Sequence, residues 1–131
     1  MRAKNKLLMF FTNNELCAIL KLALVMANAD GKVSEEESAM MCLELLRFGV
    51  DQDKVKVLAG LGDKMSNLEA CKIVSNMNAD EKKYVTAYLG AIICADGNID
   101  DSELKAWAVI TALCDLPTMS IGEAIQIMSK L

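Results

Sequence analysis

Apolar residues recur along this chain with helical spacing, and short polar clusters interrupt them. Residues 84–93 carry a stripe at i, i+3 and i+4 spacing, formed by Tyr84, Val85, Tyr88, Leu89, Ile92 and Ile93. Residues 14–28 are apolar almost all round, which is typical of a helix buried on every side. No stretch shows the alternation of apolar and polar residues that indicates a half-buried strand. The pattern therefore predicts an all-α fold.

The boundaries of these helices are marked by capping residues, glycines and one proline. A short polar residue followed three positions later by Glu, as in Thr12 to Glu15, predicts a helix start. Glycine tolerates the left-handed backbone of a helix end, so we expect Gly60 and Gly62 to end one helix. Together these signals predict about seven helices, over residues 14–28, 35–48, 51–61, 67–77, 79–93, 101–114 and 118–130.

One motif occurs twice. Residues 29–37 read Ala-Asp-Gly-Lys-Val-Ser-Glu-Glu-Glu, and residues 95–103 read Ala-Asp-Gly-Asn-Ile-Asp-Asp-Ser-Glu. The offset is 66 for both the Asp (96 − 30) and the last Glu (103 − 37), about half of the 131 residues. We therefore expect a pseudo-two-fold helical bundle built from two repeats. Residues 13–131 would form this single domain, and residues 1–12 an N-terminal arm.

Composition narrows the function classes. The net charge of −4 argues against nucleic acid, whose phosphates select basic surfaces. The chain has no histidine, which removes the usual general base and the commonest transition-metal ligand, so we expect no enzyme activity. Its five cysteines form no CxxC pair and lie in apolar stretches, which indicates reduced core thiols and a cytoplasmic location. No segment reads as a membrane span.

The repeated turns are candidate cation sites. Each can be aligned with the twelve-residue calcium loop of EF-hands, with Gly31 and Gly97 at the position that makes the turn. The candidate metal ligands are Asp30, Glu37, Asp96, Asp100 and Glu103. The first loop position, normally an anchoring Asp, is Met26 or Ile92, so each loop offers only two or three carboxylates. We therefore expect weak binding of Ca²⁺ or Mg²⁺, tighter at the second loop, where Asp100 replaces Ser34.

The doubled motif Ala-Asp-Gly-x-(Val/Ile)-x-x-x-Glu, set between helices in a small acidic chain, resembles the TerB-like tellurite-resistance proteins. The resemblance extends from about residue 14 to residue 131. It implies a pseudo-symmetric helical fold with an acidic face linked to divalent cations. It also implies a role in metal, tellurite or oxidative stress, or as an accessory domain in membrane-associated or chaperone complexes. Carried over by position, the family's acidic residues correspond to Asp30, Glu37, Asp96 and Glu103, with Gly31 and Gly97 as the turns.

Two other interpretations of the turns stay open. Glu37 and Glu103 each occupy the third position of a helix, where a capping box accounts for a Glu without any ligand. The chain would then be a purely structural protein-interaction module with no metal site. A degenerate EF-hand-like calcium binder is the other alternative. In each case we expect a protein partner. The acidic surface of this chain would favour a partner that carries basic groups.

Overall fold

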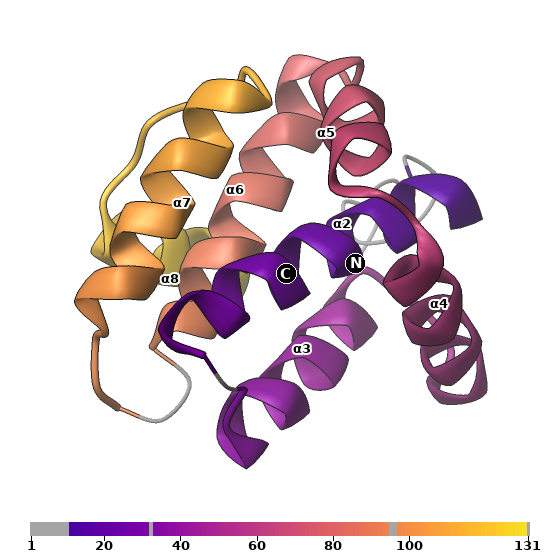
Figure 1. The fold of residues 1–131 in the computed structure, drawn as a ribbon, viewed down its shortest axis with the longest axis horizontal. Coiled ribbons are helices and arrows are strands. Elements are labelled where there is room, and N and C mark those ends of the chain that lie inside the picture. The colour runs from indigo at the N-terminus through magenta and orange to yellow at the C-terminus, as the bar shows by residue number, and fades with distance from the viewer. Residues whose placement is uncertain (1–10, 32, 95–96, 131) are drawn as a thin grey trace.

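The computed structural model describes residues 11–31, 33–94 and 97–130 (Figure 1). This part of the chain contains seven α-helices, one short 3-10 helix and no strand. They are α2 (Asn13–Ala27), η1 (Asn28–Asp30), α3 (Glu35–Arg47), α4 (Gln52–Lys64), α5 (Asn67–Ser75), α6 (Ala79–Ile93), α7 (Asp101–Leu113) and α8 (Ile121–Ser129). The all-α expectation is confirmed.

Side-chain caps explain where these helices begin. Complete capping boxes open α2, α3, α6 and α8, with Thr12, Ser34, Asn78 and Ser120 as the N-caps. Asp51, Ser66 and Asp100 cap α4, α5 and α7 by accepting one backbone N–H each. Each cap satisfies a donor that has no partner within the helix. The local sequence therefore sets the starting points of all seven helices.

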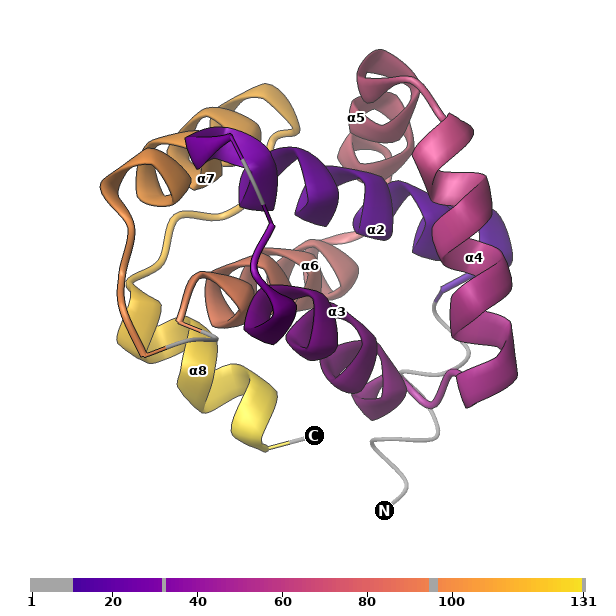
Figure 2. The same cartoon turned by 60° about the horizontal axis from the view of Figure 1, so that its bottom comes forward.

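The two long helices α2 and α6 form the centre of the molecule. In α6, every side chain from Val85 to Ile93 is buried, and α2 is buried along most of its length. The other helices lie around these two (Figures 1 and 2). At the centre, the Tyr88 hydroxyl donates a 2.8 Å hydrogen bond to the Met41 carbonyl, and the Trp107 indole N–H donates to the Thr86 carbonyl at 3.2 Å. These bonds satisfy the polar atoms that the aromatic side chains carry into the core.

Helices of each half pack against the central helix of the other half. The central helix α2 packs against α4 and α5, and α6 packs against α8. In addition, α7 from the second half packs against α2, and α3 from the first half packs against α6. This pattern is compatible with two related halves, but the pseudo-two-fold superposition itself stays a prediction.

Two of the expected boundaries are wrong. Helix α4 continues through Gly60 and Gly62 to Lys64. Gly62 is buried against α2, where an added Cβ would lie 2.9 Å from the Cys17 carbonyl oxygen. It permits close helix packing and does not end the helix. The last helix begins at Ile121, not near residue 118, because Ser120 is its cap.

The N-terminal arm is only partly described. Residues 1–10 lie outside the described part of the chain. Phe11 is buried, and its ring centroid lies 5.1 Å from that of Phe48 at the end of α3. Phe11 therefore packs on the domain next to the end of α3.

Candidate functional site at the two acidic turns

The first turn joins α2 to α3. Gly31 adopts a left-handed backbone (φ 97°), and its N–H donates to the Asn28 carbonyl at 2.9 Å. Such a φ is costly for any residue with a side chain, so glycine is required here. At the start of α3, the Glu37 carboxylate accepts the Ser34 N–H at 3.0 Å while the Ser34 hydroxyl accepts the Glu37 N–H at 3.0 Å. Glu37 is only 3% exposed. The side chain of Asp30 lies outside the described part.

The second turn joins α6 to α7. Gly97 is also left-handed (φ 83°), and its N–H donates to the Cys94 carbonyl at 3.0 Å. The Asp100 carboxylate accepts the Glu103 N–H at 3.1 Å, and Glu103 is 2% exposed. Asp96 lies outside the described residues. The structure thus confirms the two glycine turns and buries the final Glu of both copies of the motif.

The two buried glutamates are held differently. Glu37 closes a reciprocal capping box with Ser34, whereas at α7 only the forward half of the box forms, from Asp100 to the Glu103 N–H. A buried carboxylate is costly unless hydrogen bonds or opposite charge compensate it. Both are helped by the positive end of a helix dipole, but only Glu37 also accepts its own N-cap N–H. The two turns therefore differ in the hydrogen bonds at their helix starts, and the expected difference in cation affinity stays a prediction.

The fold brings the first turn close to the second half of the chain. The η1 segment with Asp30 contacts α7, the helix that contains Glu103. The segments that lead into α3 and α7 lie on the left of the molecule in both ribbon views (Figures 1 and 2). Within the described residues, no three Cys, Asp or Glu side chains converge closely enough to hold a metal ion. A complete site would thus need Asp30 and Asp96 in addition to Glu37, Asp100 and Glu103.

Besides Glu37 and Glu103, two more glutamates are buried: Glu81 in the capping box of α6, and Glu44, which was not anticipated. Glu44, 7% exposed, pairs with Arg47 at 3.0 Å, and Arg47 donates to the Met128 carbonyl at 3.2 Å. The pair borders a cavity of about 250 Å³ that Met40 and Cys94 also line. Its signal in the sequence was the i, i+3 spacing of Glu44 and Arg47, which is typical of a helical ion pair. We interpret it as a structural link between α3 and α8.

Cysteine burial is more varied than the sequence indicated. Cys17 and Cys114 are buried, Cys71 and Cys94 are half-buried, and Cys42 is exposed on α3. The expectation that the thiols are mostly buried is wrong for Cys42, which lies on the outer face of an amphipathic helix. All five are present as free thiols.

Comparison with known proteins agrees with this architecture. No helix in the described residues is long and apolar enough to cross a membrane. No curated protein matches the chain. A crystal structure of a protein of unknown function from Porphyromonas gingivalis W83 has a similar fold, with a TM-score of 0.85 and 44% sequence identity, over 91% of this chain and 90% of that chain. A family model described as "Tellurite resistance protein TerB" matches residues 16–129, including both turns. The chain therefore belongs to the TerB family.

Proposed function

We propose that this TerB-family chain is a non-enzymatic, cytoplasmic binding domain whose acidic turns bind a divalent cation weakly. The observation that carries the proposal is the pair of buried glutamates, Glu37 and Glu103, at the same place after each left-handed glycine turn. Two carboxylates are buried at corresponding positions, and a cation would offset the cost of burying their charge.

The chemistry of the donors favours an oxygen-preferring ion. Asp30, Glu37, Asp96, Asp100 and Glu103 offer only carboxylate oxygens, which suit Ca²⁺ or Mg²⁺. Two or three carboxylates per turn are few for ions that take six to eight ligands, so the affinity should be low. We expect tighter binding at the second turn, because Asp100 adds a carboxylate where the first turn has Ser34.

The cellular role follows from family membership and is likewise a proposal. A cation-dependent domain of this kind would act in the response to metal, tellurite or oxidative stress by binding a protein partner. The exposed acids Glu35, Glu36 and Asp101 beside the buried glutamates would favour a basic surface on that partner.

The proposal is tested by thermal unfolding with and without Ca²⁺ or Mg²⁺. The Kd expected for a weak site is on the order of 1 mM, and the cation is added at about ten times that Kd. A ligand that binds only the folded state at this concentration stabilises it by about 1.4 kcal/mol, or several degrees in Tm. The variant Asp96→Asn/Glu103→Gln should lose most of this shift, because it removes two of the three carboxylates at the second turn.

A charge-matched control separates binding from net charge. Asp53→Asn/Glu69→Gln removes two exposed acids on α4 and α5 and should keep the full cation-dependent shift. The proposal fails if the wild-type Tm does not respond to either cation. It also fails if the Asp96→Asn/Glu103→Gln protein responds as strongly as the wild type.

A second candidate function rests on the Ser34–Glu37 capping box. Because this box accounts for Glu37 by itself, the turns can be explained as helix caps in a structural interaction module. In that case Glu37→Gln should lower stability equally with and without cation. For a cation site, the cost of Glu37→Gln should be larger when the cation is present.

A further inference from the structure

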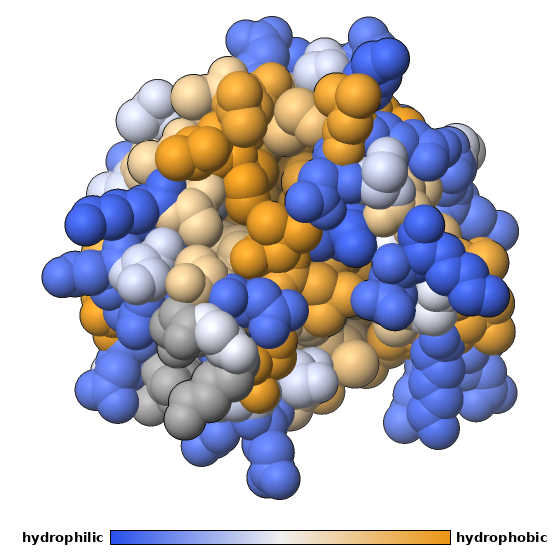
Figure 3. Space-filling view, viewed as in Figure 1, coloured by the Kyte–Doolittle hydropathy of each residue, from blue (hydrophilic) through white to orange (hydrophobic). Residues whose placement is uncertain are grey.

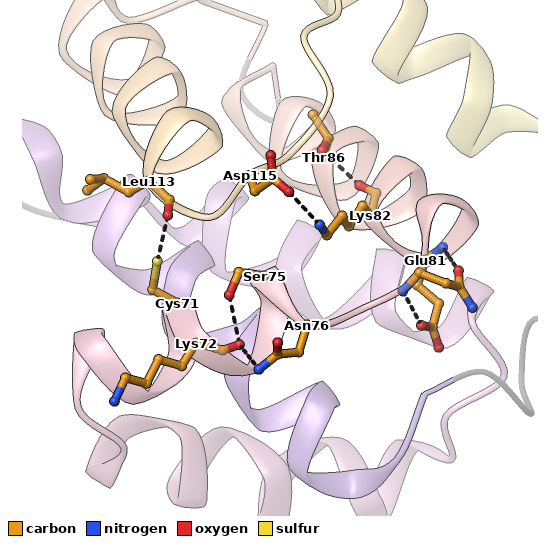
Figure 4. Close-up of polar contacts among 10 residues, drawn as sticks. Cys71, Lys72, Ser75, Asn76, Glu81, Lys82, Thr86, Leu113 and Asp115 are labelled. Carbon is orange, nitrogen blue, oxygen red and sulfur yellow. Dashed lines mark hydrogen bonds and ion pairs between the residues drawn. The ribbon is translucent and has the colours of Figure 1, made fainter.

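Two cysteines that contact each other come from distant parts of the sequence. Cys71 lies in α5, and Cys114 is the C-cap of α7, 43 positions later. The Cys114 thiol donates a hydrogen bond to the Cys71 sulfur at 2.8 Å. The Cys71 thiol in turn donates to the Leu113 carbonyl at 3.3 Å (Figure 4). The sulfurs need to approach by only about 0.8 Å to reach the ~2.05 Å of a disulfide bond.

The backbone around Cys114 is held firmly. Asp115 adopts a left-handed conformation (φ 55°), and the Leu116 N–H donates to the Thr111 carbonyl at 2.8 Å. This is the bond of a Schellman helix end. The Asp115 carboxylate also pairs with Lys82 of α6 at 3.0 Å (Figure 4). The position of Cys114 relative to α5 is therefore set by the fold and does not depend on oxidation.

The two thiols differ in access. Cys71 is half-buried and reachable from solvent, whereas Cys114 is 1% exposed. Figure 3 shows apolar side chains gathered over α7. Leu68 of α5 and Leu113 of α7 are among the exposed apolar residues. Burial and the neighbouring Cys71 raise the pKa of the Cys114 thiol to about 12. Since the thiolate is the nucleophile, Cys71 is the thiol that meets an external oxidant first.

We propose that Cys71 and Cys114 form a dithiol–disulfide pair that is oxidised by peroxides. The Cys71 thiolate attacks one peroxide oxygen, the O–O bond breaks, and the other oxygen leaves as water or an alcohol after taking a proton. The resulting Cys71 sulfenic acid is then attacked by the Cys114 sulfur, which gives up its proton. The sulfenic oxygen leaves as water. The two thiols lose two protons and two electrons, and the peroxide is reduced by the same two electrons.

The geometry favours the second step. The Cys114 sulfur already contacts the Cys71 sulfur, so its attack on the Cys71 sulfenic acid is intramolecular and has a high effective concentration. The pair is independent of whether the acidic turns bind a cation.

The test is oxidation of the reduced chain with a small excess of hydrogen peroxide in the absence of divalent cations. Five thiols should fall to three (5 − 2), the mass should drop by two hydrogens, and peptide mapping should link Cys71 to Cys114. Dithiothreitol should restore all five thiols. In Cys114→Ser the Cys71 sulfenic acid should accumulate and react with dimedone, and in Cys71→Ser the disulfide should be lost.

The exposed cysteine supplies the control. Cys42→Ser removes the most accessible thiol, and its Cys71–Cys114 disulfide should form at the wild-type rate. The proposal is overturned if the wild-type chain keeps all five thiols, or if mapping joins other cysteines. Loss of the disulfide in Cys42→Ser would equally overturn it, because Cys42 would then be the attacking thiol. Mapping is done on the wild-type protein, so the result does not depend on how well any variant folds.

Discussion

Two glycines within helices should respond in opposite directions to the same substitution. Gly90 lies in α6, where an added Cβ would be 2.6 Å from the Ala124 Cβ of α8 and 2.8 Å from Trp107 Cζ2. Gly60 lies in α4, where an added Cβ would meet nothing within 4 Å. Alanine is favoured over glycine in a helix by about 1 kcal/mol, so the intrinsic gain is equal at both sites.

The contacts at Gly90 decide whether alanine raises or lowers the stability there. Overpacking a core costs roughly 1–3 kcal/mol, and the upper end applies because a Cβ is fixed to its backbone and α8 itself must shift. Subtracting the helix gain leaves Gly90→Ala destabilised by about 2 kcal/mol. Gly60→Ala should gain up to about 1 kcal/mol. For a chain of this size each kcal/mol corresponds to a Tm change of about 3–5 °C.

The assay is urea unfolding followed by far-UV circular dichroism, with Gly60→Ala as the matched control. A further variant, Gly90→Ala/Ala124→Gly, removes the closest contact and should recover part of the lost stability. If Gly90→Ala is as stable as the wild type while Gly60→Ala gains as expected, the close packing of α6 on α8 is wrong. If Gly60→Ala loses stability, the described course of α4 is wrong.

Two further predictions concern pH and oxidation. Burial, followed by the nearby Cys42 and Glu44, raises the pKa of Tyr88 well above 10. Tyr88 therefore stabilises the folded state fully at pH values below about 10, which is the pKa of tyrosine in the unfolded chain. This stabilisation is lost as the pH rises above that value, by about 1.4 kcal/mol at pH ~11. Urea titrations at several pH values should show this loss in the wild type and in Tyr84→Phe but not in Tyr88→Phe; an equal loss in all three contradicts the assignment. The Cys71–Cys114 disulfide would close a loop that spans 43 positions. Because this lowers the entropy of the unfolded chain, it should stabilise the oxidised protein by about 4 kcal/mol. Urea unfolding with and without dithiothreitol measures this difference, and no change on reduction of the mapped disulfide would refute it.

The features that depend on neighbours in sequence could be predicted. The helix starts at Thr12, Ser34 and Asn78 follow from a polar side chain and a Glu three positions later, which interact within one turn. The left-handed Gly31 and Gly97 follow in the same way from the Asp-Gly breaks between apolar runs. Both signals act locally, so the rest of the fold hardly changes them.

The features that depend on distant contacts could not be predicted. Gly62 reads as a helix stop, and only the approach of α2 shows that it permits close packing. The pairing of Cys71 with Cys114 is set by where α5 meets the end of α7, and no spacing rule predicts a contact across 43 positions. The same holds for the contact of η1 with α7, which brings the first turn to the helix of the second.

The packing of helices from one half on the central helix of the other has a consequence for synthesis of the chain. Because α7 covers α2 and α3 packs on α6, the first half has no finished core until the second half has been translated. The part of the apolar surface of α2 that α7 covers stays exposed until α7 has been made, and such surface promotes aggregation. Nearly the whole chain must therefore be synthesised before the core around α2 and α6 is complete.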